Sequence, residues 1–261
     1  MSWPVYRYSV NVKEPPSSSD PRVSAFIDKN QTWIVLDDPS NLNALDPEFV
    51  RALAEQIEAV ETKYLILTGR NGAFSSGGQL ETVSALAKQA ETDKLGVEAI
   101  VREGGNLVED ILFSNATTVA LIDGVCAGAG IGIALACDIQ LATARARYST
   151  AYAKLGLPTD FGTRELLRHR IGHEAADEMI KNAELIGVGK AQKLGLVDAT
   201  IERIDPKTVK KALKELKAPN RKSLLKSMSA VLDAEAADFA QALKNPKVQV
   251  KVEKALTKKH A

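Results

Sequence analysis

The chain has few of the residues on which metal sites and disulfides depend. It contains two cysteines, Cys126 and Cys137, and three histidines, His169, His173 and His260. The cysteines are not in a C-x-x-C arrangement and no histidines cluster near them, so we expect no metal site. His169 and His173 are four residues apart and could share a helix face, but no third ligand is evident. The cysteines are interpreted as buried, reduced thiols in a cytoplasmic protein.

Net charge and long apolar runs are also lacking. The formal net charge is +1, which gives no electrostatic reason to expect a nucleic acid or an anionic membrane as partner. No uncharged apolar run approaches the roughly 18 residues that a membrane span needs, and we expect no signal peptide at the N-terminus. With 45% hydrophobic and 26% charged residues, the 261-residue chain has the composition of an ordinary globular protein with a substantial core.

Strand and helix patterns alternate through the middle of the chain. Two short apolar runs, 23–27 and 32–36, predict a β-hairpin. Asp46 followed by Pro47 predicts the start of a helix that runs to about residue 60. Further strands are predicted at 63–68, 118–122, 138–143 and about 196–201, and helices within 79–113, 163–183 and 187–198. Parallel strands that alternate with helices place the body of the chain in the α/β class.

The two ends of the chain differ from this body. Residues 1–22 are rich in proline and serine, and we interpret them as an N-terminal arm. The core is predicted to span 23–202. Residues 203–261 show no strand pattern and carry lysine and alanine at helical spacing, which predicts a separate helical segment. Its lysines are expected to form a solvated face, although the basic tail from Lys247 onward could also contact a phosphate-bearing ligand.

Two glycine-rich turns follow predicted strands, at 69–78 and 123–132. Such a turn presents free backbone N–H groups at the positive end of a helix, where an oxygen that becomes negative is stabilised. Close packing of a strand against a helix, with no ligand, explains the same glycines equally well. The pattern lacks both the lysine of a phosphate-binding loop and the acidic residue of a dinucleotide fold.

Five motifs occur in order in the middle of the chain, at residues 43–45, 73–81, 124–138, 151–163 and 191–197. Their order and spacing resemble the crotonase superfamily, also called the enoyl-CoA hydratase/isomerase family. The resemblance covers about residues 23–202. It implies a spiral of stacked β-β-α units, followed by a C-terminal helical segment that assembles a homotrimer or a dimer of trimers. It also implies an acyl-CoA substrate and a place in fatty acid metabolism, with no cofactor apart from the coenzyme A of the substrate.

The same resemblance assigns roles within the glycine-rich turns. The backbone N–H groups of Ser76 and Ala129 match the two donors that bind the thioester oxygen. Loss of one such donor typically costs about 3–4 kcal/mol of transition-state stabilisation. The other positions that the resemblance assigns to substrate binding are Ala44, Phe74, Gly77, Gly78, Gln79, Gly128, Gly132, Tyr152 and Phe161.

The acid and base residues determine the reaction within this family. The two glutamates of a hydratase fall at Gly132 and Tyr152 here, and neither side chain transfers a proton as a carboxylate does, so hydration is disfavoured. We expect Tyr152 to line the pocket. Asp160 lies in a segment similar to that of Δ3,Δ2-enoyl-CoA isomerases, whose single catalytic carboxylate matches it. Asp160 could instead, or in addition, cap the helix that begins near Thr163.

The sequence therefore predicts an enoyl-CoA isomerase that moves a double bond from C3 to C2, with Asp160 as the base. One alternative is another enolate reaction, such as C–C cleavage, decarboxylation or thioester hydrolysis. A second is a non-catalytic acyl-CoA-binding homologue. Two residues depart from the family pattern: Gln79 replaces the usual aspartate, and Phe161 replaces a small residue beside the base and is expected to narrow the acyl pocket.

Overall fold

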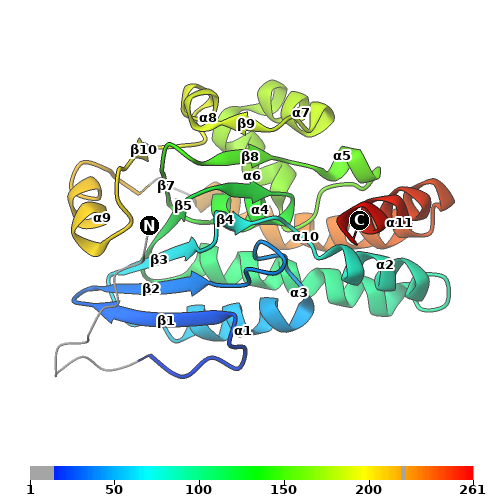
Figure 1. Ribbon diagram of the computed structural model, residues 1–261, viewed down its shortest axis with the longest axis horizontal. Coiled ribbons are helices and arrows are strands. Elements are labelled where there is room, and N and C mark those ends of the chain that lie inside the picture. Colours follow the sequence, from blue (N-terminus) through cyan, green and yellow to red (C-terminus); the bar gives the residue numbers. More distant parts are fainter. Residues whose placement is uncertain (1–14, 219–221, 261) are drawn as a thin grey trace.

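The protein is described by a computed structural model for residues 15–218 and 222–260, which form two β-sheets with helices packed around them (Figure 1). The larger sheet has six strands in the order β1 (Val23–Asp28), β2 (Gln31–Leu36), β3 (Tyr64–Gly69), β5 (Thr117–Ile122), β7 (Ile139–Ala142) and β10 (Ala199–Thr200). β1 and β2 form the predicted antiparallel hairpin, and the remaining pairs are parallel. The smaller sheet contains β4 (Ala73–Ser75), β6 (Val125–Ala127), β8 (Arg147–Ser149) and β9 (Ile186–Gly187).

A unit of one strand in the larger sheet, one short strand in the smaller sheet and one helix occurs three times. The units are β3, β4 and α2 (Leu80–Gln89); β5, β6 and α4 (Ala129–Ala136); and β7, β8 and α5 (Tyr152–Leu155). This is the predicted spiral of β-β-α units. β4, β6 and β8 are parallel neighbours, so the chain leaves all three at the same edge of the smaller sheet. The turns that follow these strands therefore lie side by side.

The remaining helices of the core lie around the two sheets. They are α1 (Pro47–Glu58), α3 (Lys94–Phe113), α6 (Thr163–Ile171), α7 (His173–Asn182), α8 (Val188–Leu194) and α9 (Pro206–Ala212). α1 begins as predicted, because the Asp46 side chain accepts a hydrogen bond from the Phe49 N–H and Pro47 occupies the first helical position. The strand β2 is buried along its whole length, and its Trp33 side chain is 1% exposed.

The segment 79–113 is helical, as predicted, and consists of two helices, because the chain breaks between α2 and α3 and Asp93 caps the second by accepting from the Gly96 N–H. One helical expectation needs correction. His169 and His173 do not share a helix face, since Gly172 adopts a left-handed φ of +83° and separates α6 from α7. Within residues 15–218 and 222–260, no three His, Cys, Asp or Glu side chains are grouped as a metal site would require.

The C-terminal helices α10 (Lys222–Leu243) and α11 (Pro246–His260) pack on the core. α10 lies along α3, and α11 lies against α2 (Figure 1). Buried residues of α2, α3, α10 and α11 form one hydrophobic cluster, which includes Val97, Phe239 and Val252. The predicted helical segment therefore shares a core with the spiral.

The N-terminal arm lies mostly outside the described residues, which begin at Pro15. From there to Arg22 the chain contains no helix or strand, as predicted. Arg22 forms ion pairs with Asp20 of the arm at 2.5 Å and with Asp46 of the core at 2.6 Å. The pair with Asp46 fastens the arm to the core. In the part of the chain that the structure describes, none of the helices has the length and apolar character needed to span a membrane.

Candidate active site

The two glycine-rich turns meet at the edge of the smaller sheet. Gly77 follows β4 with a φ of +95°, and a Cβ placed on it would lie 2.9 Å from the Ala127 carbonyl oxygen and 3.4 Å from the Ala129 nitrogen. A Cβ on Gly130 would lie 2.9 Å from the Ser75 Cβ. Side chains at Gly77 or Gly130 would force the two turns apart. Close packing therefore accounts for these glycines, and the same packing brings the two predicted donor turns together.

Ala129 stands at the first position of α4, where a backbone N–H has no partner within its own helix. Its neighbour Gly128 donates to the Ser149 carbonyl at 3.0 Å, and the Ile131 N–H donates to the Gly128 carbonyl at 2.9 Å. Within the described chain, no acceptor is bonded to the Ala129 N–H. The arrangement suits the predicted role of Ala129 as a donor to an oxygen that becomes negative.

Ser76 differs from this expectation. Its N–H donates to the Leu42 carbonyl at 3.0 Å, and its hydroxyl donates to the Asn41 carbonyl at 3.0 Å. The loop that carries these acceptors contains two non-glycine residues with left-handed φ, Leu42 at +53° and Asn43 at +56°. The prediction of two free donors is therefore wrong for this conformation, because the Ser76 amide is already bonded. It becomes a donor to a thioester only when its bond to Leu42 opens.

The other residues predicted for these turns have mainly structural positions. Phe74 is fully buried in the main hydrophobic cluster and Ala44 is 5% exposed. Gly78 forms a bridge to Leu45, which holds the turn against the preceding loop. Gln79 is the N-cap residue of α2, where its side-chain oxygen accepts from the Thr82 hydroxyl at 3.0 Å. The departure from aspartate at Gln79 thus keeps a local hydrogen bond at the start of α2.

Asp160 is a buried carboxyl group at the wall of a small apolar pocket. It is 8% exposed, and Tyr152 donates a hydrogen bond to its Oδ1 at 2.6 Å. Burial raises the pKa of Asp160 to about 6, although the bond from Tyr152 acts in the opposite direction. The side chain does not cap α6: the N-cap residue is Gly162, and only the backbone carbonyl of Asp160 accepts from the Thr163 N–H. Capping alone therefore does not explain Asp160.

Tyr152 is not among the residues that line this pocket, and its predicted place in the substrate pocket stays a prediction. It is buried beneath Asp160, and its hydroxyl also lies 3.1 Å from the Thr163 Oγ1. Burial, together with the negative charge of Asp160, raises the pKa of Tyr152 well above its ordinary value. The phenol therefore stays protonated and serves as a hydrogen-bond donor to the carboxylate.

Gly132 explains why the first hydratase glutamate is absent. A Cβ on Gly132 would lie 2.5 Å from the Phe161 carbonyl oxygen and 2.8 Å from the Thr163 Oγ1. The turn that carries Asp160 occupies the space into which a glutamate side chain would extend from α4. The close contact between Gly132 and the turn that carries Asp160 therefore leaves no room for this glutamate.

The pocket at Asp160 has a volume of about 60 Å³ and lies between α1, α2, α3 and α10. The ring of Phe161 forms part of its wall, as predicted, and rests so closely on α3 that a Cβ on Gly104 would lie 2.2 Å from it. Leu45, whose N–H donates to the Gly77 carbonyl at 2.8 Å, connects the pocket to the first glycine-rich turn. Its lining residues are Leu45, Asp46, Pro47, Val50, Thr82, Val83, Leu86, Ile100, Val101, Glu103, Gly104, Asp160, Phe161 and Phe239.

Glu235 is a second carboxyl group near Asp160 that the sequence analysis missed. It lies on α10 and accepts hydrogen bonds from the Thr159 hydroxyl at 2.9 Å and the Gly162 N–H at 2.7 Å. Burial, and then the charge of Asp160, raise the pKa of Glu235 to about 7. The sequence did contain a sign of Glu235: it lies on α10 three residues after the buried Leu232 and four before the buried Phe239. Helical spacing favours an apolar residue at such a position.

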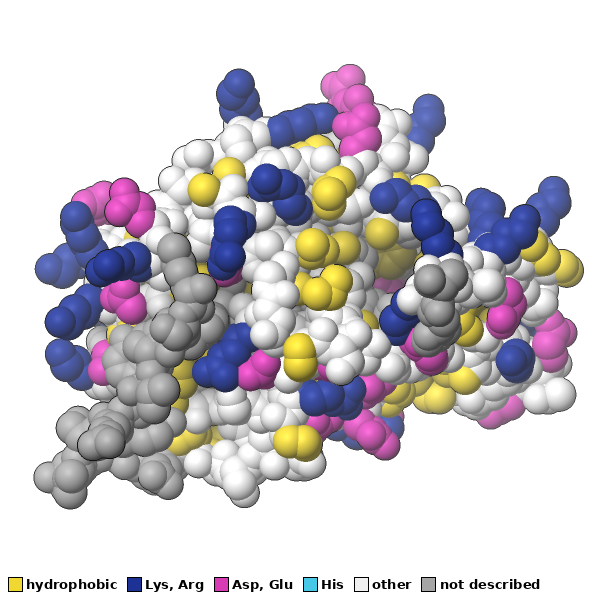
Figure 2. All heavy atoms as spheres, viewed as in Figure 1, with side chains coloured by type: hydrophobic (Ala, Val, Ile, Leu, Met, Phe, Trp, Pro, Cys, Tyr) yellow, Lys and Arg dark blue, Asp and Glu magenta, His cyan; other side chains and the backbone are white. Residues whose placement is uncertain are grey.

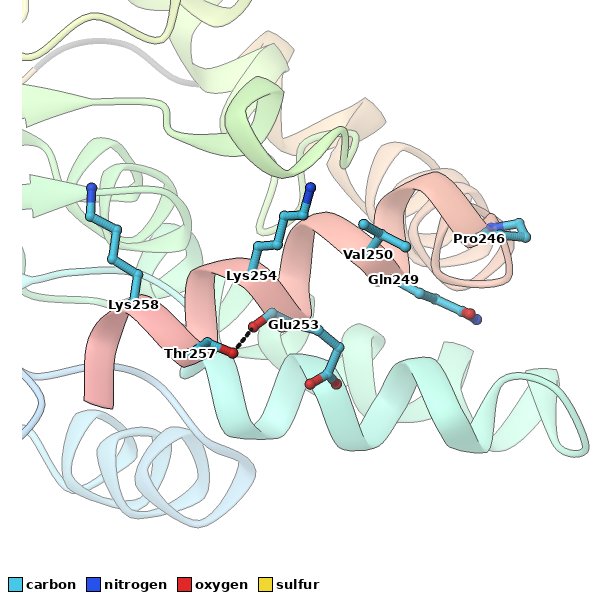
Figure 3. Close-up of a pocket in the computed structure, with 7 residues that line it drawn as sticks. All are labelled: Pro246, Gln249, Val250, Glu253, Lys254, Thr257 and Lys258. Atoms are coloured by element: carbon cyan, nitrogen blue, oxygen red, sulfur yellow. Dashed lines mark hydrogen bonds between the residues drawn. The ribbon is translucent and has the colours of Figure 1, made fainter. Parts of the chain in front are cut away.

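A separate hollow of about 610 Å³ runs along the outer face of α11 (Figure 3). Lys254 and Lys258 extend from the same side of the helix there, and Val250 is 52% exposed. Figure 2 shows Lys and Arg side chains along this part of the surface. The hollow contains none of the predicted site residues, and contact between the basic tail and a phosphate-bearing ligand stays a prediction. Its lining residues are Pro246, Gln249, Val250, Glu253, Lys254, Thr257 and Lys258.

Comparisons with known proteins agree with this geometry. Residues 28–259 match the family model described as enoyl-CoA hydratase/isomerase. The chain is 30% identical over 175 residues to the "Probable enoyl-CoA hydratase" of Rhodobacter capsulatus, an alignment that covers 66% of this chain and 65% of that protein, slightly less than two thirds of its length. It is 31% identical over 202 residues to the "Putative enoyl-CoA hydratase" of Thermus thermophilus, covering 74% of each. The structure of an enoyl-CoA hydratase from Bacillus halodurans superposes with a TM-score of 0.80 at 27% identity, covering 89% of this chain and 99% of that one.

Proposed function

Because this chain belongs to the enoyl-CoA hydratase/isomerase family, we propose that it moves a double bond from C3 to C2 of an enoyl-CoA. The observation that carries the proposal is Asp160, a buried carboxyl group with a raised pKa, at the wall of an apolar pocket. The named relatives are hydratases, but the positions of the hydratase glutamates hold Gly132, which has no room for a side chain, and Tyr152, which is a donor to Asp160. One carboxylate is sufficient for isomerisation, since that reaction needs no activated water.

In the proposed reaction, the thioester oxygen accepts a hydrogen bond from the Ala129 N–H. The ionised Asp160 removes a proton from C2, and the electrons of that C–H bond form a dienolate with the existing C3–C4 double bond. Protonation of C4 by Asp160 then leaves the double bond between C2 and C3. The Ser76 N–H adds a second donor when the bond to Leu42 opens. The reaction as proposed requires no metal or redox cofactor, only the coenzyme A of the substrate.

A pKa of about 6 suits Asp160 for this work. At pH 7 the carboxyl group is mostly ionised and ready to accept a proton. It is also a stronger base than an exposed aspartate, whose pKa is about 3.9, and so it accepts a carbon-bound proton more readily.

Replacement of Asp160 by asparagine tests the proposal. Asp160→Asn keeps the size of the side chain and removes the base, so we expect kcat for conversion of a 3-enoyl-CoA to the 2-enoyl-CoA to fall by about 10³-fold. Binding of a non-reactive acyl-CoA should change little. Asp238→Asn, an exposed position on α10, is the control and should keep wild-type activity.

Isomerisation by the Asp160→Asn variant at the wild-type rate would contradict the proposal that Asp160 is the base of an isomerase. The same assay should follow the release of free coenzyme A and of CO₂ from a panel of acyl-CoA esters. Release of either by the wild type, with no isomerisation, would favour a different enolate reaction. Binding of the esters without turnover of any would favour a non-catalytic acyl-CoA-binding protein.

We also propose a homotrimer or a dimer of trimers as the assembly, on the resemblance of the C-terminal helices to those of the family. The cytoplasmic location stays a prediction. Cys126 and Cys137 are both buried, as expected, and neither is in a disulfide bond within the described residues.

A further inference from the structure

Glu235 reaches the active site from outside the three β-β-α units. Its two carboxylate oxygens are bonded separately: Oε1 accepts from the Thr159 hydroxyl at 2.9 Å, and Oε2 accepts from the Gly162 N–H at 2.7 Å. Thr159 and Gly162 lie immediately before and two residues after Asp160. One side chain from α10 thus holds both ends of the turn that carries the proposed base.

The backbone of this turn needs such support. Phe161 has a φ of +51° and Gly162 a φ of +65°. A bulky residue such as Phe161 enters the left-handed region only with backbone strain, and surrounding contacts must hold it there. The Gly162 N–H also lies at the start of α6, where no side chain of the helix itself caps the backbone. The Glu235 carboxylate supplies this missing partner.

Charge adds a second link between Glu235 and Asp160. Asp160 is buried and Glu235 is half-buried; their pKa values are raised to about 6 and about 7, and negative charge on Asp160 contributes to the raised pKa of Glu235. The other groups that act on Glu235 are the Thr159 hydroxyl, the Gly162 N–H and, from α6, Arg164. The Tyr152 phenol on α5 responds to both carboxylates. On α3, which packs along α10, Arg102 is engaged by Asp233 and Glu109.

We propose that Glu235 is a positioning residue for this reaction: by accepting hydrogen bonds from Thr159 and Gly162, it holds the turn that aims Asp160 at the substrate. The identity of the reaction rests on the proposed function above. The link between the two carboxyl groups is a property of the protein without substrate, so it is tested separately.

The first test follows the two carboxyl groups in the full-length protein, with no substrate added. Carbon-13 NMR titration of labelled Asp and Glu side chains gives the pKa of each group. Asp160 ionises first and its charge raises the pKa of Glu235, so Asp160→Asn should lower the pKa of Glu235. Glu235→Gln should leave the pKa of Asp160 nearly unchanged, because Glu235 is still mostly neutral at the pH where Asp160 ionises. Asp238→Asn removes a charge from the exposed face of the same helix and should move neither.

The second test separates positioning from charge. Thr159→Val removes one hydrogen bond to Glu235 and leaves its charge intact. We expect it to lower kcat about 10-fold to 100-fold with little change in KM, because it loosens the turn that aims Asp160. Glu235→Gln removes one of the two carboxylate acceptors and should lower kcat by a similar factor, again with little change in KM. A residue with only a structural role would lower the yield of folded protein without lowering the kcat of the folded fraction.

Two results would overturn the proposal: wild-type kcat in Glu235→Gln, or wild-type kcat in Thr159→Val. Each variant is compared only when its circular dichroism spectrum shows the same folded content as the wild type. If the wild type isomerises no 3-enoyl-CoA but Asp160→Asn still lowers the pKa of Glu235, then the proposed function fails and the link between the two carboxyl groups stands.

Discussion

Two opposite influences act on the carboxyl group of Asp160, and their balance makes it usable near neutral pH. Burial raises its pKa, while the 2.6 Å hydrogen bond from Tyr152 lowers it, and the outcome is a value of about 6. Without the phenol, a buried carboxyl group would hold its proton at the pH where the reaction needs a base. Tyr152, which occupies the position of a hydratase glutamate, thus keeps Asp160 ionised.

Tyr152→Phe tests this balance. The variant loses the hydrogen bond but keeps the ring, so the pKa of Asp160 should rise above about 6 and the acid limb of the kcat/KM profile should move to higher pH. The control is Tyr64→Phe, which removes a hydroxyl on β3, outside the site. A limb that stays in place, or moves to lower pH, would contradict this account of Tyr152.

At the scale of elements, the first turn of α4 packs against the turn at 159–163 through Gly132. Gly132→Ala adds a Cβ that would lie 2.5 Å from a backbone oxygen, so the two elements must separate. We expect a loss of stability of about 1–3 kcal/mol and a lower kcat, measured by denaturant unfolding and by the isomerase assay.

Gly189→Ala is the matched control for this prediction. Gly189 lies in α8, and a Cβ there meets nothing within 4 Å. Alanine is the better helix former, so this variant should be more stable by about 0.5–1 kcal/mol. If Gly132→Ala gave a similar gain, α4 and the turn would not be in the contact described.

Elements with strong local signals were predictable from the sequence, and those set by neighbours were not. Asp46 and Pro47 mark the start of α1 through local chemistry alone, and the apolar runs of β1 and β2 define the hairpin. β4, β6 and β8 have three residues each, too few for an alternating pattern, and were missed. They become strands because each pairs with the next turn of the spiral.

The residues of the site also divide into those predictable from local sequence and those set by distant parts of the chain. Asp160 and Ala129 were located by motif, and the spiral brings their turns together. The bond between Ser76 and Leu42 depends on a loop folded back from elsewhere in the chain, so no local pattern indicates it. Glu235 lies 75 positions after Asp160 in a helix rich in lysine and alanine, and only the packing of α10 on α3 reveals its role.

For the molecule as a whole, the site reduces stability at neutral pH. Asp160 has a higher pKa in the folded protein than in the unfolded chain, where it is about 3.9. Its contribution to stability is therefore fully present below about pH 4 and is lost as the pH rises through about 6. A shift of this size corresponds to a cost of at most about 3 kcal/mol once the group is ionised.

Asp160→Asn should therefore be inactive and yet more stable than the wild type at pH 8. We expect its Tm to exceed that of the wild type by several degrees at pH 8 and to approach it near pH 4, because the wild-type carboxyl group is then neutral. Thermal unfolding followed by circular dichroism measures both differences. The Asp238→Asn control should show no such dependence on pH. An equal Tm difference at both pH values would rule out the ionisation of Asp160 as its cause.

The attachment of the last two helices also sets an order of events during synthesis. α10 and α11 follow the spiral in the chain, so they emerge from the ribosome after it. Until α10 docks on α3, the turn around Asp160 lacks Glu235. Until α11 docks on α2, the loop at Asn41 lacks the bond from Lys259, whose ammonium group also pairs with Glu81 at 2.8 Å. A nascent chain can thus complete its sheets while the site is unfinished, and it acquires catalytic competence only in the final stage of its folding.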